Sequence, residues 1–216
     1  MPTETIMFTS GDGIRLEGRL ATPDERPPRG GAVICHPHPQ YGGSMSSKLV
    51  PAMQRELVAS GWVALRFNFR GVGRSEGSYD SGIGEIADVL GALERVREAA
   101  PDQTAVVGWS FGAIVGLNAA ARDGRVASYA GVAPPVRRAL TGKMELPQIA
   151  ELDGWNARSL IVCGTEDPFC RPPDAEELVR QLPPPAEVRV VQGADHFFEG
   201  HVEELCSIVA SFVAGA

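Results

Sequence analysis

The chain alternates between two patterns of hydrophobic positions. Short apolar runs of about four to eight residues are typical of buried strands, and apolar residues spaced three or four apart indicate amphipathic helices. Residues 14–21 (IRLEGRLA) instead alternate apolar and polar side chains, which predicts a half-exposed antiparallel strand. The runs that predict buried parallel strands are residues 31–35, 62–69, 105–108, 126–132, 160–163 and 188–191.

Helical periodicity fills most gaps between these runs. The apolar stripes are Val50-Met53-Leu57-Val58, Ile86-Val89-Leu90-Leu93-Val96 and Val202-Leu205-Val209-Phe212-Val213. Pro172 and Pro173 precede DAEELVRQL and predict another helix start. The order β, β, β, α, β, α, β, α, β, loop, β, α, β, α predicts an α/β fold, with a mostly parallel central sheet flanked by helices on both faces.

Composition narrows the class of protein. The length suits one domain over residues 1–216, and no linker or repeat divides it. A formal net charge of −7 without a basic cluster argues against nucleic acid and membrane surfaces as partners. No apolar run is long enough to span a bilayer, and residues 1–12 do not form a secretory signal, so we expect a cytoplasmic protein. The four cysteines lack metal-site spacing and are interpreted as buried hydrophobic residues.

The pattern G-x-S-x-G occurs at residues 73–77 and 108–112. A nucleophilic serine in this pattern needs a sharp turn from a strand directly into a helix. Ser110 follows an apolar strand and precedes the helix-forming GAIVGLNAAA, whereas Ser75 lies between loop-like segments. We therefore predict Ser110 as the nucleophile and interpret Ser75 as a turn residue.

A serine nucleophile needs a base within hydrogen-bond reach. With a strand–turn–helix serine, the chain order is serine, acid, histidine, which selects the two C-terminal histidines, His196 and His201. His196 comes in the loop after the strand at 188–191, where the base must lie, so we favour it over His201 as the base. His201 has an alternative interpretation as a solvated residue at a helix start.

The acid must hold the imidazole in the correct tautomer. Asp167 follows the strand at 160–163 and precedes a proline, which favours an extended or turn backbone. We predict Asp167 in this role, with Glu166 and Asp195 as alternates. Asp195 also suits a turn former beside His196.

The oxyanion hole needs two backbone N–H donors. One is expected from Phe111, directly after the nucleophile, and the other from the loop at residues 36–44. The two prolines of that loop cannot donate, which leaves His38, Gln40 and Tyr41. Of these three we choose His38.

Two other patterns suggest cofactors but lack the required context. The histidines of His36-Pro37-His38 could both bind a metal, yet no third ligand follows nearby. Residues 82–87 match G-x-G-x-x-A without a preceding strand, so a dinucleotide site is not expected. We therefore predict no metal and no cofactor.

The sequence resembles the α/β-hydrolase superfamily over nearly its whole length. The resemblance rests on GWSFG at 108–112, on Asp167 and His196, and on FRGVGRS at 69–75. CHPHPQYGGSM at 35–45 is similar to the H-P-H-P loop of small, lidless bacterial serine hydrolases, described as carboxylesterases near the dienelactone-hydrolase-like group. Dienelactone hydrolases themselves use a cysteine nucleophile, so Ser110 departs from their pattern.

The resemblance implies hydrolysis of carboxylic esters through an acyl-enzyme. Cap domains of the superfamily usually follow the sixth strand, but residues 133–157 can hold one short helix around 146–152 and no full cap. An open site favours small to medium soluble esters, with Tyr41, Trp109 and Phe197 as substrate-binding wall residues or as ordinary aromatic packing. Thioesters, lactones or amides are alternative substrates of the same triad, and a non-catalytic binding protein is a further alternative. A small-molecule ester is the expected partner, and the protein is expected to be a monomer or homodimer.

Overall fold

The computed structural model describes residues 3–24, 27–136, 152 and 154–215. The strands are β1 (Thr3–Thr9), β2 (Arg15–Ala21), β3 (Gly31–Cys35), β4 (Val63–Phe67), β5 (Thr104–Trp109), β6 (Val126–Val132), β7 (Arg158–Gly164) and β8 (Ala186–Val191). They form one eight-stranded sheet in the order β1-β2-β4-β3-β5-β6-β7-β8. β2 pairs antiparallel with β1 and β4, and all pairs from β4 to β8 are parallel.

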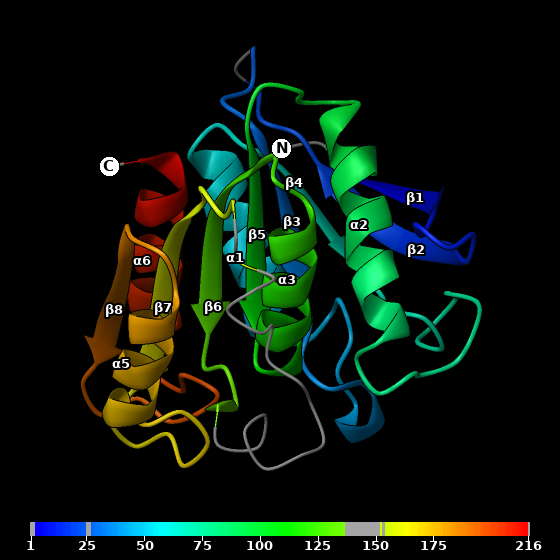
Figure 1. Cartoon of the computed structure of the whole chain (residues 1–216). Coiled ribbons are helices and arrows are strands. Elements are labelled where there is room, and N and C mark those ends of the chain that lie inside the picture. Colours follow the sequence, from blue (N-terminus) through cyan, green and yellow to red (C-terminus); the bar gives the residue numbers. More distant parts are fainter. Residues whose placement is uncertain (1–2, 25–26, 137–151, 153, 216) are drawn as a thin grey trace.

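Helices cover both faces of the sheet. They are the 3₁₀ turn η1 (Pro39–Tyr41) and the α-helices α1 (Leu49–Ala59), α2 (Gly84–Arg97), α3 (Phe111–Arg122), α5 (Pro172–Gln181) and α6 (Val202–Ala214). Figure 1 shows α2, α3 and α5 in front of the sheet and α1 and α6 behind it. Val89 and Leu178 pack in the front core, and Leu57 and Leu205 in the rear one. Each such buried side chain contributes about 1.5–3 kcal/mol of transfer free energy. The predicted fold class is confirmed.

Two strand predictions were wrong about exposure. β2 lies inside the sheet, and five of its seven residues are buried rather than half-exposed. Its buried Glu17 carboxylate accepts hydrogen bonds from Asn68 Nδ2 (2.6 Å) and from the Arg74 backbone N–H (2.8 Å), which offset desolvation. The run at 188–191 was predicted as buried, but β8 is the last strand of the sheet and Val190 is exposed.

The parallel strands all end at one edge of the sheet, at the bottom of Figure 1. The loops that follow β3, β5, β7 and β8 meet there, and this is the edge where ligands bind in parallel α/β sheets. The short helix predicted around 146–152 lies outside the described residues except for Leu152.

Candidate active site

Ser110 lies in a sharp turn between β5 and α3. Its backbone is at φ 56° and ψ −117°, a conformation that residues other than glycine rarely adopt. A Cβ on Gly108 would lie 2.3 Å from the Gly112 carbonyl oxygen, and a Cβ on Gly112 would lie 2.4 Å from the Cys35 carbonyl oxygen. The glycines therefore let α3 approach the sheet closely enough for the turn to form.

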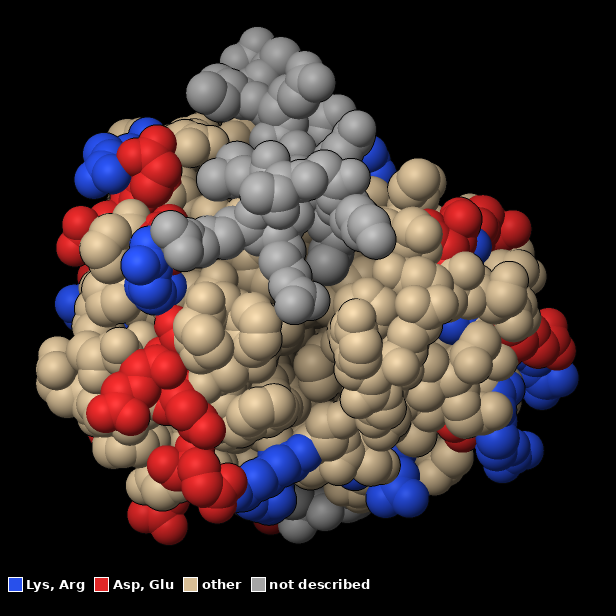
Figure 2. All heavy atoms as spheres, turned by 90° about the horizontal axis from the view of Figure 1, so that it is seen from below, with Lys and Arg blue, Asp and Glu red and all other residues tan. Residues whose placement is uncertain are grey.

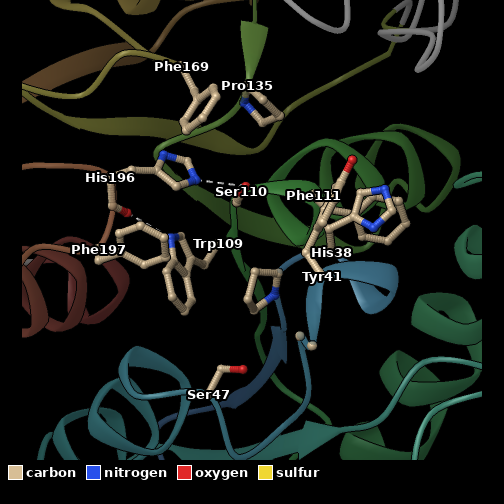
Figure 3. A pocket seen from close by; sticks show the side chains of 13 residues that line it. His38, Tyr41, Ser47, Trp109, Ser110, Phe111, Pro135, Phe169, His196 and Phe197 are labelled. Carbon is tan, nitrogen blue, oxygen red and sulfur yellow. Dashed lines mark hydrogen bonds between the residues drawn. The ribbon is translucent and has the colours of Figure 1, made fainter.

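His196 joins Ser110 to Asp167. Ser110 Oγ lies 3.0 Å from His196 Nε2, as drawn in Figure 3, and His196 Nδ1 lies 2.9 Å from Asp167 Oδ2. Because a carboxylate only accepts, His196 Nδ1–H donates to it and Nε2 is left to accept from the serine hydroxyl. The structure thus brings together the three side chains that the sequence analysis selected, from the loops after β5, β7 and β8.

Backbone donors hold the buried Asp167 carboxylate. Its Oδ1 accepts hydrogen bonds from the N–H groups of Phe169 (2.7 Å) and Cys170 (3.1 Å), so both oxygens have partners. These bonds offset the loss of water around a buried charge. The His196 loop is tied to β5, because Trp109 Nε1–H donates to the His196 carbonyl oxygen at 3.2 Å. His196 is therefore held at its side chain by Asp167 and at its backbone by Trp109.

The alternates for base and acid have other contacts. His201 precedes α6 and its Nδ1 lies 3.4 Å from Glu204 Oε2. Asp195 Oδ1 accepts from the backbone N–H groups of Phe197 and Glu199, as a turn former does. Glu166 is exposed. None of these contacts involves Ser110.

Two backbone segments flank the serine where an oxyanion would form. Phe111 is the first residue of α3, so its N–H is one of the donors that a helix leaves without an intrahelical acceptor. Across from it, Gln40 N–H donates to His38 Nδ1 (3.2 Å) and Tyr41 N–H donates to the His38 carbonyl oxygen (3.1 Å). Two of the three loop candidates, Gln40 and Tyr41, therefore donate within η1, and the choice of His38 stays a prediction. The His38 and Phe111 rings are in contact, with centroids 4.9 Å apart.

Ser75 and His36 have structural contacts. The buried Ser75 hydroxyl donates to the Asn68 carbonyl oxygen (2.7 Å) and accepts from Glu17 N–H (3.1 Å). His36 Nδ1–H donates to the Pro37 carbonyl oxygen (2.6 Å) and Nε2 accepts from Phe69 N–H (3.1 Å). Burial lowers the pKa of His36 to about 4, so its imidazole is neutral. In the described residues no three metal-ligating side chains cluster.

Ser110 opens onto a pocket of about 410 Å³ (Figure 3). The three wall residues predicted from the sequence, Tyr41, Trp109 and Phe197, all line it. Sequence reasoning missed Ser47, Pro135 and Phe169, which line it as well. For Phe169 a signal was present, since it follows the predicted acid by two residues in the same loop.

Comparison with known proteins places this geometry in a family. A family model described as the alpha/beta hydrolase fold matches residues 33–158, from β3 to the start of β7. The chain belongs to the alpha/beta hydrolase fold family. The matched span contains Ser110 and its turn, whereas Asp167 and His196 lie beyond it and are joined to the serine by the two His196 contacts.

Bacterial relatives match almost the whole chain of this hydrolase-family member. Protein RP471 of Rickettsia prowazekii (strain Madrid E) is 30% identical over 215 residues, which cover 96% of this chain and 87% of that one. An alpha-beta serine hydrolase homologue from Coxiella burnetii is 32% identical with a TM-score of 0.84, covering 99% and 98%. XC6422 from Xanthomonas campestris, described as an a/b serine hydrolase without lid, is 28% identical with a TM-score of 0.81, covering 98% and 94%. The predicted resemblance to lidless bacterial hydrolases is confirmed.

The helices of this family member are short or polar compared with a membrane span. Among the described residues, none of them combines the length and the apolar composition that crossing a bilayer requires.

Proposed function

We propose that the protein is a carboxylesterase-type serine hydrolase that cleaves small to medium carboxylic esters. The observation that carries the proposal is the pair of His196 contacts, 3.0 Å to Ser110 Oγ and 2.9 Å to Asp167 Oδ2, at an open pocket. The relatives from Coxiella burnetii and Xanthomonas campestris, both described as serine hydrolases, support the reaction class.

The proposed reaction has two steps. Ser110 Oγ attacks the ester carbonyl carbon while His196 Nε2 accepts the hydroxyl proton, and the imidazolium is stabilised by Asp167. The tetrahedral intermediate collapses, the C–O bond to the alcohol breaks, and His196 returns the proton to the leaving oxygen. A water molecule, deprotonated by His196, then attacks the acyl-enzyme and releases the acid. Water is the only co-substrate.

The carbonyl oxygen becomes negatively charged in both steps. In the proposal, the backbone N–H groups of Phe111 and His38 donate to it. Each preorganised donor of this kind lowers a barrier by about 3–4 kcal/mol. The N–H of Phe111 also lies at the positive end of the α3 dipole, which favours an anion at that point.

The test is the variant Ser110→Ala with p-nitrophenyl acetate as substrate. Without the hydroxyl no acyl-enzyme forms, so kcat should fall by about 10⁴-fold or more while the thermal unfolding midpoint stays near that of the native protein. A fluorophosphonate should label the native protein once, and peptide mapping should find the adduct on Ser110. Near-native turnover in the variant, or labelling at another serine, would contradict the proposal.

A further inference from the structure

The described residues that line the pocket include no aspartate, glutamate, lysine or arginine. Its lining consists of aromatic rings, prolines, glycines and serines together with His38 and His196. Figure 2, which looks onto this edge of the sheet, shows an uncharged area between the charged side chains at the left and at the right of the view. A charged substrate group would lose its hydration in the pocket without gaining a counter-charge. The chemistry of the site therefore favours an uncharged substrate.

Aromatic rings stand partly exposed at the rim of this pocket. Phe197 is 55% exposed and Tyr41 is 78% exposed, although both are large and hydrophobic. The Trp109 and Phe197 rings meet edge to face, with centroids 6.0 Å apart and an interplanar angle of 84°. An aromatic ring of a substrate gains more binding free energy from such surfaces than an aliphatic group of equal area. The reason is that the edge of one ring attracts the face of another, in addition to the burial of apolar area.

The proposed reaction limits where the acyl group can lie. The leaving oxygen must approach His196 Nε2, and the oxyanion must face Phe111, so the acyl group is directed into the remaining part of the pocket. Figure 3 shows Ser47 on the opposite side of the pocket from Phe169 and Pro135. The acyl group thus has two directions open to it, and of the side chains on these two sides Ser47 is the one that carries a hydrogen-bonding group.

The Ser47 hydroxyl is able to donate a hydrogen bond to a ligand. Its Oγ accepts from the Ser44 backbone N–H at 3.0 Å, which fixes the oxygen in place. Within the described part of the chain, no acceptor receives its O–H proton. A hydroxyl whose oxygen already accepts a hydrogen bond, and whose O–H is not donated within the protein, is suited to donate to an acceptor atom of a ligand.

We propose that the pocket binds esters of uncharged aromatic acids and that Ser47 is a specificity-determining residue, which donates a hydrogen bond to an acceptor atom on the acyl group. The inference rests on the proposed function, because the triad orients the ester. It goes further by naming the acyl class and the side chain that selects it.

The experiment compares matched p-nitrophenyl esters by kcat/KM. A phenylacetate should be preferred over the cyclohexylacetate by about 2- to 10-fold if the rings recognise an aromatic group. Methoxyphenylacetates should be compared with the isosteric ethylphenylacetates at each ring position. At one position or more the methoxy ester should be preferred by about 3- to 10-fold, the usual worth of a neutral hydrogen bond. In Ser47→Ala that preference should fall to about 1.

Ser46→Ala is the matched control, because Ser46 is an exposed neighbour whose side chain lies outside the pocket. It should keep the methoxy preference. Purely structural damage in Ser47→Ala would lower both members of a pair equally and leave the ratio unchanged. A native ratio near 1 at every position, a ratio that survives Ser47→Ala, or a cyclohexyl preference would overturn the proposal.

Calorimetric binding of the same esters to Ser110→Ala separates this proposal from the proposed function. That variant should bind without turnover, and the methoxy preference should appear in Kd and disappear in the double variant Ser47→Ala/Ser110→Ala. If native protein hydrolyses no ester but the binding preference is present, the proposed function fails and the acyl recognition stands. If hydrolysis occurs without any preference in Kd or kcat/KM, the acyl recognition fails and the proposed function stands.

Discussion

At the scale of single residues, His36 shows how a buried ionisable group links the loop between β3 and α1 to the core. It is completely buried, and its two ring nitrogens satisfy the Pro37 carbonyl oxygen and the Phe69 N–H. The contact with Phe69 requires the neutral ring, since a protonated ring would place N–H against N–H there, whereas Nδ1–H donates to Pro37 in either form. Burial holds the pKa at about 4, below the ordinary value of 6.5.

We therefore predict an acid-dependent loss of stability from His36. Below pH 6.5 the unfolded chain binds a proton at this residue that the folded chain does not bind until about pH 4. The free energy of unfolding should fall across this window by about 3 kcal/mol in total from this residue. Urea denaturation between pH 7 and pH 4 should show a shallower decline for His36→Gln.

His201→Gln is the control for that experiment, because His201 is partly exposed and hydrogen-bonds within its own helix turn. It should reproduce the native pH dependence. An identical decline for native protein and His36→Gln would contradict the account of the buried imidazole.

The sequence was sufficient to propose Ser110, Asp167 and His196, because each follows an apolar strand and parallel strands end at one edge. It was not sufficient for Ser47. That side chain lies before α1, far from the serine in sequence, and reaches the pocket only through the packing of the β3–α1 loop. No local pattern marks such a position.

At the scale of elements, the turn between β5 and α3 depends on close contact with β3. A Cβ on Gly112 would lie 2.4 Å and 2.5 Å from the Cys35 and His36 carbonyl oxygens. Both neighbours are backbone atoms, which cannot rotate away as a side chain can. The start of α3 can therefore pack this closely against the end of β3 only because residue 112 has no side chain.

We predict that Gly112→Ala displaces the start of α3. The substitution should lower the free energy of unfolding by about 1–3 kcal/mol, as overpacking does. It should also lower kcat, because the Phe111 N–H moves with the helix. Gly124→Ala provides the comparison, since a Cβ there meets nothing within 4 Å, and it should change stability by less than about 0.5 kcal/mol. Equal stability of the two variants in thermal unfolding would argue against the close contact.

The position of a strand in the sheet was harder to predict than its existence. The runs at 188–191 and 160–163 are both mostly apolar, with Arg189 as the exception, and both form strands, β8 and β7. β7 is interior and β8 is at the edge, a difference that depends on which strands pair and that Arg189 alone signals locally. The alternating run at 14–21 was misjudged for the same reason: β2 pairs on both sides.

At the scale of the whole molecule, Arg70 connects three parts of the chain beside the sheet. Its guanidinium lies 2.7 Å from Asp88 Oδ1 in α2 and 2.9 Å from Asp12 Oδ1 in the β1–β2 turn. Arg70 itself follows β4, and its backbone N–H donates to Asp88 Oδ2 at 2.9 Å. The Asp88 side chain is fully buried, whereas that of Asp12 is 45% exposed. The same cation thus has one buried and one solvated partner.

The two carboxylates allow a buried and a solvated ion pair of the same guanidinium to be compared. In Asp88→Asn the Arg70 charge remains in the core with its buried partner neutralised, which should lower the free energy of unfolding by about 3–5 kcal/mol. In Asp12→Asn water replaces the lost charge, and the loss should be at most about 1 kcal/mol. Urea denaturation at pH 7 measures both, and 1 M salt should reduce the Asp12 effect while changing the Asp88 effect little. Equal losses of unfolding free energy in the two variants would mean that water screens the two ion pairs alike. The contact between Arg70 and Asp88 would then not be a water-excluded link between α2 and the sheet.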